Sequence, residues 1–192
     1  MKFRPILLFL SCIFIAAGSN AAELAGVKLD DKIRVSPAGL ELVLNGMGIR
    51  TRFVFKVYVG GLYLPEKKTN ANDILSLPGA KRVSITLLRD ITAQQFTESL
   101  AEGVRNNSSP AEQEALKARV DLLFGIMNAL KEAKKGDVIL LDDQPDSGVS
   151  LTVNGQPQGK PIPGDDFQRA LLRIWLGDKP ADPDLKKGML GG

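Results

Sequence analysis

The most distinctive stretch of the chain reads Leu44-Asn45-Gly46-Met47-Gly48-Ile49-Arg50 and, after Thr51 and Arg52, Phe53-Val54-Phe55-Lys56-Val57-Tyr58-Val59-Gly60-Gly61-Leu62-Tyr63-Leu64. We predict a strand over 52–64. Because strand side chains alternate between faces, it divides into Phe53, Phe55, Val57 and Val59 on one face and Val54, Lys56 and Tyr58 on the other. Apolar residues on both faces indicate a strand covered on both sides, and the paired glycines Gly60-Gly61 suggest a bulge or a bend in it.

Arg50 is the first candidate for a binding residue. Two glycines precede it, so its backbone can turn tightly or approach another segment closely. An arginine at the start of an apolar strand can hold a carboxylate with two hydrogen bonds, and the hydroxyl of Tyr58 can add a third. The same residues also fit a purely structural arrangement, in which Arg50 pairs with a nearby acidic side chain and Tyr58 is a core residue with a satisfied hydroxyl.

The rest of the chain alternates strands with helices. In the first half we expect strands over 27–35 and 40–44, a short helix near Ile74 capped by Asn72, and a strand over 82–88. A helix from Thr92 and a long helix from Ser109, closed by Lys134-Lys135-Gly136, should follow. The last part should form strands over 137–141 and 148–153, a hairpin at Asn154-Gly155 into a strand near 160–162, a helix capped by Asp165 or Asp166 and ended by Gly177, and a helix from Asp182. This order predicts an α+β domain, with a mostly antiparallel sheet and helices packed on one face.

The N-terminus has the pattern of a cleavable export signal. Lys2 and Arg4 precede an apolar run over 6–17, and small residues follow, so we expect cleavage after Ala21 or Ala22. The apolar run is too short for a membrane-spanning helix, which needs about 20 residues. We therefore expect a signal peptide over 1–22, one domain over 23–192, and a periplasmic or secreted protein. Lipid attachment at Cys12 is the less favoured alternative.

The composition narrows the chemistry. The chain has no histidine and one cysteine, Cys12, which lies in the signal. Catalytic triads, imidazole ligands and thiolate sites are therefore excluded from the mature domain. Removal of Lys2 and Arg4 reduces 25 basic residues to 23, against 22 acidic ones. With no basic stripe, we expect no nucleic-acid partner. We also expect no cofactor and no metal site, because the acidic residues over 142–146 have the pattern of a turn.

Three segments are similar to the chalcone isomerase-like family. They are the glycine–arginine stretch with its continuation to Tyr63, the helix start Ile91-Thr92-Ala93-Gln94-Gln95-Phe96, and the C-terminal segment from Phe167 through Trp175 to Pro180. The resemblance implies an open-faced β-sandwich, in which a large antiparallel sheet packs against a layer of helices with a cleft for a hydrophobic ligand between them.

The resemblance also implies which catalytic groups are missing. In the plant enzymes of this family an arginine, a threonine, a helical tyrosine and asparagine, and a late hydroxyl residue form the isomerase site. The arginine is similar to Arg50, but the other positions correspond to Tyr58, Phe96, Gly103 and Ile174. Phenylalanine, glycine and isoleucine cannot supply the polar groups that cyclisation needs, so we expect no chalcone isomerase activity.

We therefore expect a non-catalytic binding protein for a fatty acid or a similar hydrophobic carboxylate. The ligand residues would be Arg50, Tyr58, Phe96, Ile174 and Trp175. A straight strand would separate Arg50 from Tyr58 by about 26 Å, so both can reach one ligand only if the chain turns or bulges between Ile49 and Phe53. Two alternatives stay open: an isomerase or lyase of unknown substrate that uses Lys56 as a base, and a structural or interaction protein whose cleft is packed shut.

Overall fold

The computed structural model describes residues 21–35, 39, 41–130 and 132–192. Nearly all of the predicted signal peptide lies outside these residues, and both expected cleavage sites fall in the first two residues of the first strand. A seven-stranded antiparallel sheet dominates the structure, in the order β11-β10-β9-β6-β5-β4-β3. Its strands are β3 (Lys32–Arg34), β4 (Glu41–Arg52), β5 (Phe55–Leu64), β6 (Lys81–Leu87), β9 (Val138–Gln144), β10 (Gly148–Val153) and β11 (Gln156–Ile162).

Two small two-stranded sheets and five helices complete the described part of the chain. The small sheets pair β1 (Ala21–Leu24) with β2 (Val27–Asp30), and β7 (Ile91–Thr92) with β8 (Glu132–Ala133). The helices are α1 (Ala71–Ser76), α2 (Ala93–Asn106), α3 (Pro110–Asn128), α4 (Asp165–Leu176) and α5 (Pro183–Met189).

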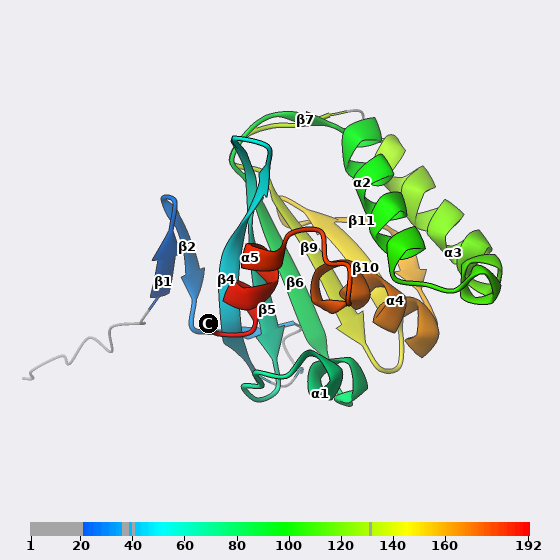
Figure 1. Cartoon of the computed structure of the whole chain (residues 1–192), viewed down its shortest axis with the longest axis horizontal. Coiled ribbons are helices and arrows are strands. Elements are labelled where there is room, and N and C mark those ends of the chain that lie inside the picture. The colour runs from blue at the N-terminus through cyan, green and yellow to red at the C-terminus, as the bar shows by residue number, and fades with distance from the viewer. Residues whose placement is uncertain (1–20, 36–38, 40, 131) are drawn as a thin grey trace, which may run out of the picture.

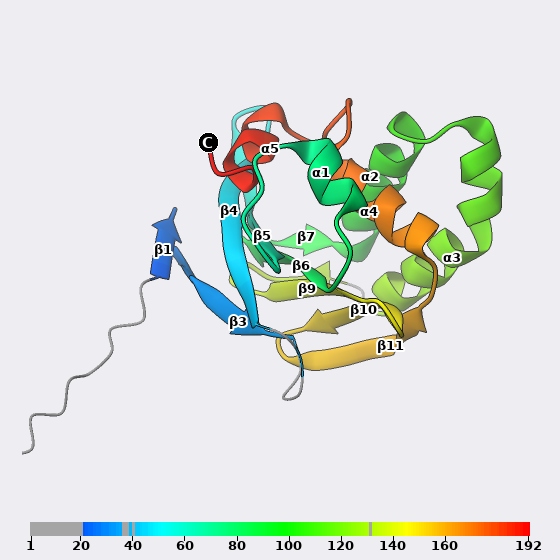
Figure 2. The same ribbon diagram turned by 90° about the horizontal axis from the view of Figure 1, so that it is seen from below.

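The large sheet curls around the helices (Figures 1 and 2). Helix α4 lies on the concave side and packs against α1, α2, α3, α5 and β10. Its buried face, which includes Phe167, Leu171 and Trp175, meets the inward side chains of the sheet in one hydrophobic core. A second, smaller core around Leu29 and Tyr63 lies on the opposite face, under β1 and β2. The predicted architecture of a large antiparallel sheet with a helical layer is confirmed.

The strand predicted over 52–64 is wrong at its start, because the chain reverses there. β4 and β5 form a hairpin through Phe53 and Val54, and Phe53 has a positive φ of 55°. The register shifts after Arg50, so one extra residue of β5 breaks the predicted alternation of faces. The extra residue is Val57, so the faces of the residues before it are no longer in phase with those of Tyr58 and Val59. Tyr58 and Val59 are buried, whereas residues 53–55 are exposed. The bulge predicted at Gly60-Gly61 is absent, since both glycines pair regularly with β4.

The local signals in the sequence succeed where a side chain itself makes the helix cap. Thr92 and Ser109 form the predicted capping boxes, and Asp182 caps α5. Three details differ. Asn70 rather than Asn72 caps α1, α3 ends at Asn128 instead of near Gly136, and α4 begins after Gly164 without a side-chain cap. The chain after α3 instead forms β8, which pairs with β7.

Candidate functional site

The β4–β5 hairpin makes Arg50 and Tyr58 direct neighbours. The two residues are cross-strand partners in the ladder, so the sequence separation that would span about 26 Å in a straight strand is closed by the turn. The chain was expected to turn or bulge between Ile49 and Phe53. It reverses at Phe53 and Val54, and the register shift opposite Arg50 and Thr51 leaves Val57 of β5 as the extra residue. The guanidinium carbon of Arg50 lies 5.7 Å from the centre of the Tyr58 ring.

Tyr58 faces the interior. Its side chain is buried, and its hydroxyl oxygen accepts a hydrogen bond of 2.8 Å from the indole Nε1 of Trp175 on α4. Burial raises the pKa of the Tyr58 hydroxyl, while the charge of Arg50 opposes this rise. The phenol is therefore neutral at physiological pH, and its ring supports the guanidinium from behind through a cation–π contact.

Arg50 forms no ion pair within the described residues, and its Nε is buried without a hydrogen-bond partner. The carboxylate of Asp182 lies nearby but accepts a hydrogen bond of 2.8 Å from the Thr51 amide instead. A buried polar atom without a partner costs free energy, so its presence calls for an explanation. The structural arrangement in which an acidic side chain neutralises Arg50 is not found, and the guanidinium is free to bind an anion.

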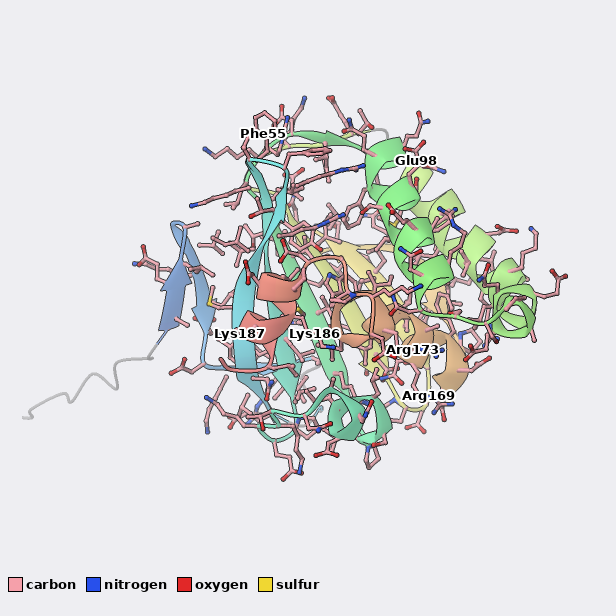
Figure 3. All side chains as sticks on the ribbon, viewed as in Figure 1. Phe55, Glu98, Arg169, Arg173, Lys186 and Lys187 are labelled. Carbon is pink, nitrogen blue, oxygen red and sulfur yellow. The ribbon has the colours of Figure 1, made fainter. Side chains whose placement is uncertain are left out.

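A groove of about 430 Å³ opens beside this guanidinium. We call it the hairpin groove. It lies between the β4–β5 hairpin, the turn from β6 into β7, and the first turns of α2, and Figure 3 labels Phe55 and Glu98 on its two sides. Its wall is lined by the apolar residues Phe53, Phe55, Val57, Ile91 and Phe96, by Arg50, Arg52 and Arg89, and by Gln95, Glu98 and Ser99.

A second hollow of about 220 Å³ lies on the other side of Arg50. It shares Arg50, Arg52 and Ser99 with the hairpin groove, but its remaining lining comes mostly from polar residues near Glu102, Asn106 and Lys179. Arg50 thus lies at the boundary between a groove with both apolar and charged walls and a mostly polar hollow. This arrangement suits an amphiphile whose charged head lies at Arg50 and whose apolar part lies in the hairpin groove.

The structure brings together only part of the predicted ligand set. Arg50 and Phe96 line the hairpin groove, whereas Tyr58, Ile174 and Trp175 lie behind it in the core. Tyr58 and Trp175 support Arg50 from the interior. Ile174 packs against Gly103, where an added Cβ would lie 2.7 Å from Cγ2 of Ile174. Helix α2 therefore approaches α4 so closely that the space for an asparagine at position 103 is already filled.

Three further residues of the groove, Arg89, Ile91 and Gln95, were not predicted as ligand residues. Ile91 and Gln95 belong to the helix start that is similar to the family, and the side chain of Gln95 accepts a hydrogen bond from the Thr92 amide. Arg89 lies with its guanidinium carbon 4.8 Å from the centre of the Phe55 ring. The one available signal was the arginine directly after a buried strand, which gives no indication of its partner. Lys56, the proposed base of the enzymatic alternative, is exposed and does not line the groove.

Asp142 and Asp143, two of the acidic residues over 142–146, have structural partners. The guanidinium of Arg82 pairs with Asp142 through two hydrogen bonds, the one from Nη2 being 2.7 Å long. Lys81 lies 4.0 Å from Asp143, and residues 145–147 form the turn between β9 and β10. Among the described residues, no three acidic, histidine or cysteine side chains form a group that could hold a metal ion. None of the described helices combines the length and the apolar character that crossing a membrane requires.

The family model described as chalcone isomerase-like matches residues 21–191. A crystal structure of a fatty-acid binding protein from Arabidopsis thaliana has a similar fold, with a TM-score of 0.68 and 14% sequence identity over 89% of this chain and 96% of the plant chain. At this identity the likeness concerns the fold. No curated protein sequence matches the chain significantly. The family match spans the sheet, the helical layer and both walls of the hairpin groove, and the chain belongs to the chalcone isomerase-like family.

Proposed function

We propose that the protein is an exported, non-catalytic binding protein for a fatty acid or a similar hydrophobic carboxylate, with the carboxylate held by Arg50. The observation that carries the proposal is the guanidinium of Arg50, which has no ion-pair partner in the described part of the chain and lines a groove whose other wall residues include five apolar side chains. The Arabidopsis protein of similar fold is a fatty-acid binding protein, which agrees with this proposal.

Different parts of the hairpin groove would contact the two ends of such a ligand. A carboxylate beside Arg50 would gain charge-assisted hydrogen bonds and satisfy the orphaned Nε. The hydrocarbon part would contact Phe55, Val57 and Phe96. The groove volume of about 430 Å³ lies within the range of roughly 300–1,000 Å³ that small-molecule sites occupy.

The contacts around α2 support a non-catalytic role. Phe96 presents an apolar ring to the groove, and the contact between Gly103 and Ile174 fills the region where the plant enzymes have polar groups. No proton donor or acceptor is supplied by these three positions. Neither does Lys56 line the groove, so a base-catalysed reaction there gains no support.

One observation favours the alternative of a closed cleft. The hollow in the interior beside Trp175 measures only about 20 Å³, so the layer between the sheet and α4 is almost completely filled. A ligand buried in that layer would have to displace core side chains. The hairpin groove makes such displacement unnecessary, and for this reason we place the ligand there.

The test compares Arg50→Met with Arg105→Met. Arg105 is an exposed arginine in the last turn of α2, outside the groove, so the two variants remove the same charge. Calorimetric titration with a soluble saturated fatty acid should show a loss of about tenfold to a hundredfold in affinity for Arg50→Met, since hydrogen bonds to charged groups contribute roughly 1.5–3 kcal/mol. The Arg105→Met variant should bind like the wild type. Equal affinities of both variants would reject the proposal.

A further inference from the structure

The tip of the β4–β5 hairpin exposes three consecutive apolar residues. Phe53 is 88% exposed, Val54 84% and Phe55 55%. In the described part of the chain, the other large apolar side chain that is similarly exposed is Leu122, on α3. We call residues 53–55 the hairpin tip. Single exposed apolar residues are ordinary on a protein surface, but a contiguous projecting group marks an interaction site.

The backbone of the hairpin tip is unusual for its sequence. Arg52 pairs with Phe55, which leaves a two-residue loop whose first residue, Phe53, has a φ of 55°. Glycine is the usual residue at such a position, because a side chain is strained there. A bulky aromatic residue thus occupies a position where it contributes neither a relaxed turn nor core packing. Strain and exposure together indicate that the tip serves binding.

Basic side chains surround the hairpin tip. Arg52, Lys56 and Arg89 are exposed, and no ion pair of the described residues includes any of the three. The nearest acidic residue along the chain, Asp90, already pairs with Lys134 and accepts a hydrogen bond from the Lys135 amide. Three cations without an ion-pair partner therefore flank the tip, against one carboxylate, Glu98, on the opposite side of the groove. An apolar tip with this excess of positive charge is complementary to a surface of apolar chains beneath anionic headgroups.

We propose that the hairpin tip docks on an anionic lipid surface, with Phe53, Val54 and Phe55 inserted among the acyl chains and Arg52, Lys56 and Arg89 at the headgroups. Phe53 and Phe55 also line the hairpin groove, so a docked tip places the mouth of the groove at the membrane. If the groove binds a fatty acid as proposed above, the ligand can pass between membrane and protein without crossing water. Docking itself does not depend on that function.

The docking test measures co-sedimentation with vesicles of phosphatidylcholine, with and without phosphatidylglycerol. The wild-type chain should bind the anionic vesicles far more tightly than the neutral ones. Val54→Asp should weaken this binding at least tenfold, because it removes an apolar group that the docked protein buries in the bilayer and adds a negative charge. Leu122→Asp is the matched control and should bind like the wild type. Each of Arg52→Gln and Arg89→Gln should cost about fivefold.

A local probe separates the tip from the apolar N-terminal run. In a Cys12→Ser background, a solvent-sensitive fluorophore attached through Val54→Cys should shift its emission to the blue on anionic vesicles, and one attached through Leu122→Cys should not. Unchanged emission at position 54, or wild-type binding by Val54→Asp, would overturn the docking proposal.

The docking and ligand-binding proposals fail separately. Val54 does not line the hairpin groove, so Val54→Asp should keep the wild-type affinity for a soluble fatty acid while it loses vesicle binding. Arg50→Met should lose affinity for the fatty acid. When Arg50→Met is combined with Cys12→Ser and Val54→Cys and labelled at position 54, the fluorophore should still report docking. A chain that docks but binds no fatty acid contradicts the proposed function alone.

Discussion

Two arginines of the same sheet are placed opposite tyrosines of β5, and they have opposite electrostatic environments. Arg82 of β6 is the cross-strand partner of Tyr63 and pairs with Asp142 of β9. Arg50 of β4 is the partner of Tyr58 and has no acidic partner in the described residues. The neutralised arginine belongs to the fold. The arginine with an orphaned nitrogen and a groove beside it is available for a ligand.

The two positions also differ in what surrounds them. Asp142 and the side chain of Arg82 are 7% and 14% exposed, so little water reaches the pair. Next to Arg50, the hairpin groove and the polar hollow keep the guanidinium accessible. The same residue type therefore stabilises the protein at one position and can bind a ligand at the other.

The largest effect should come from removing the neutralised arginine. Arg82→Met leaves the carboxylate of Asp142 buried without a counter-charge, so we expect the free energy of unfolding to fall by roughly 3–5 kcal/mol. Arg50→Met should change it by less than about 1 kcal/mol, because no buried charge loses a partner. Urea denaturation checks both values.

The double variant Arg82→Met with Asp142→Leu should recover most of the lost stability, because it removes both charges. Equal destabilisation by Arg82→Met and Arg50→Met would break the distinction between the two arginines.

A smaller loss of stability is expected from breaking the hydrogen bond between Trp175 and Tyr58, the cross-strand partner of Arg50. Tyr58→Phe removes the acceptor of the Trp175 indole, and the buried N–H is left without its partner. We expect a loss of about 1–3 kcal/mol. Trp175 is the only tryptophan of the chain, so its fluorescence reports the change directly. Tyr63→Phe, opposite Arg82, is the control. If the two phenylalanine variants were equally stable, the hydrogen bond would contribute nothing.

The smallest expected effect is the pH dependence of stability that comes from Asp143. Asp143 and Lys81 lie beside α4, at the small interior hollow next to Trp175. Burial raises the pKa of Asp143 from 3.8 to about 6, and Lys81 partly opposes this rise. The folded state thus binds a proton that the unfolded state has released, and the resulting stability is lost as the pH rises through about 6. Relative to Asp143→Asn, the wild type should lose roughly 1 kcal/mol between about pH 4 and pH 7.

Thermal unfolding of both proteins across this pH range gives the difference. A difference that stays constant with pH would show that Asp143 titrates normally. Tyr58 should contribute nothing to the curve, since burial raises the pKa of its hydroxyl above the ordinary value of about 10.

The sequence predicted those elements whose signals are local. Thr92, Ser109 and Asp182 make their caps with their own side chains, and Asn154-Gly155 adopts the two positive φ angles of its hairpin. The β4–β5 hairpin escaped prediction because its turn lacks a glycine. A strained phenylalanine at the turn and the register shift after Arg50 hide it within an apparently continuous alternating strand.

The candidate site was predicted in part. Arg50 was identified from its place between two glycines and an apolar strand, Phe96 was identified from the resemblance to the family, and both line the groove. Arg89 and Ile91 come to the groove through the register of β5 against β6, which no local pattern encodes. Ile174 and Trp175 were expected at the ligand, but the close approach of α2 to α4 at Gly103 encloses Ile174 in the core, and Trp175 is turned towards Tyr58.

The most direct test of the central claim, that Arg50 is an anion anchor, compares a soluble fatty acid with its methyl ester in calorimetric titrations. The wild type should bind the acid at least about tenfold more tightly than the ester, because only the acid carries a charge for the guanidinium. Arg50→Met should bind both equally. A wild type that does not discriminate, or discrimination that persists in Arg50→Met, would contradict the account.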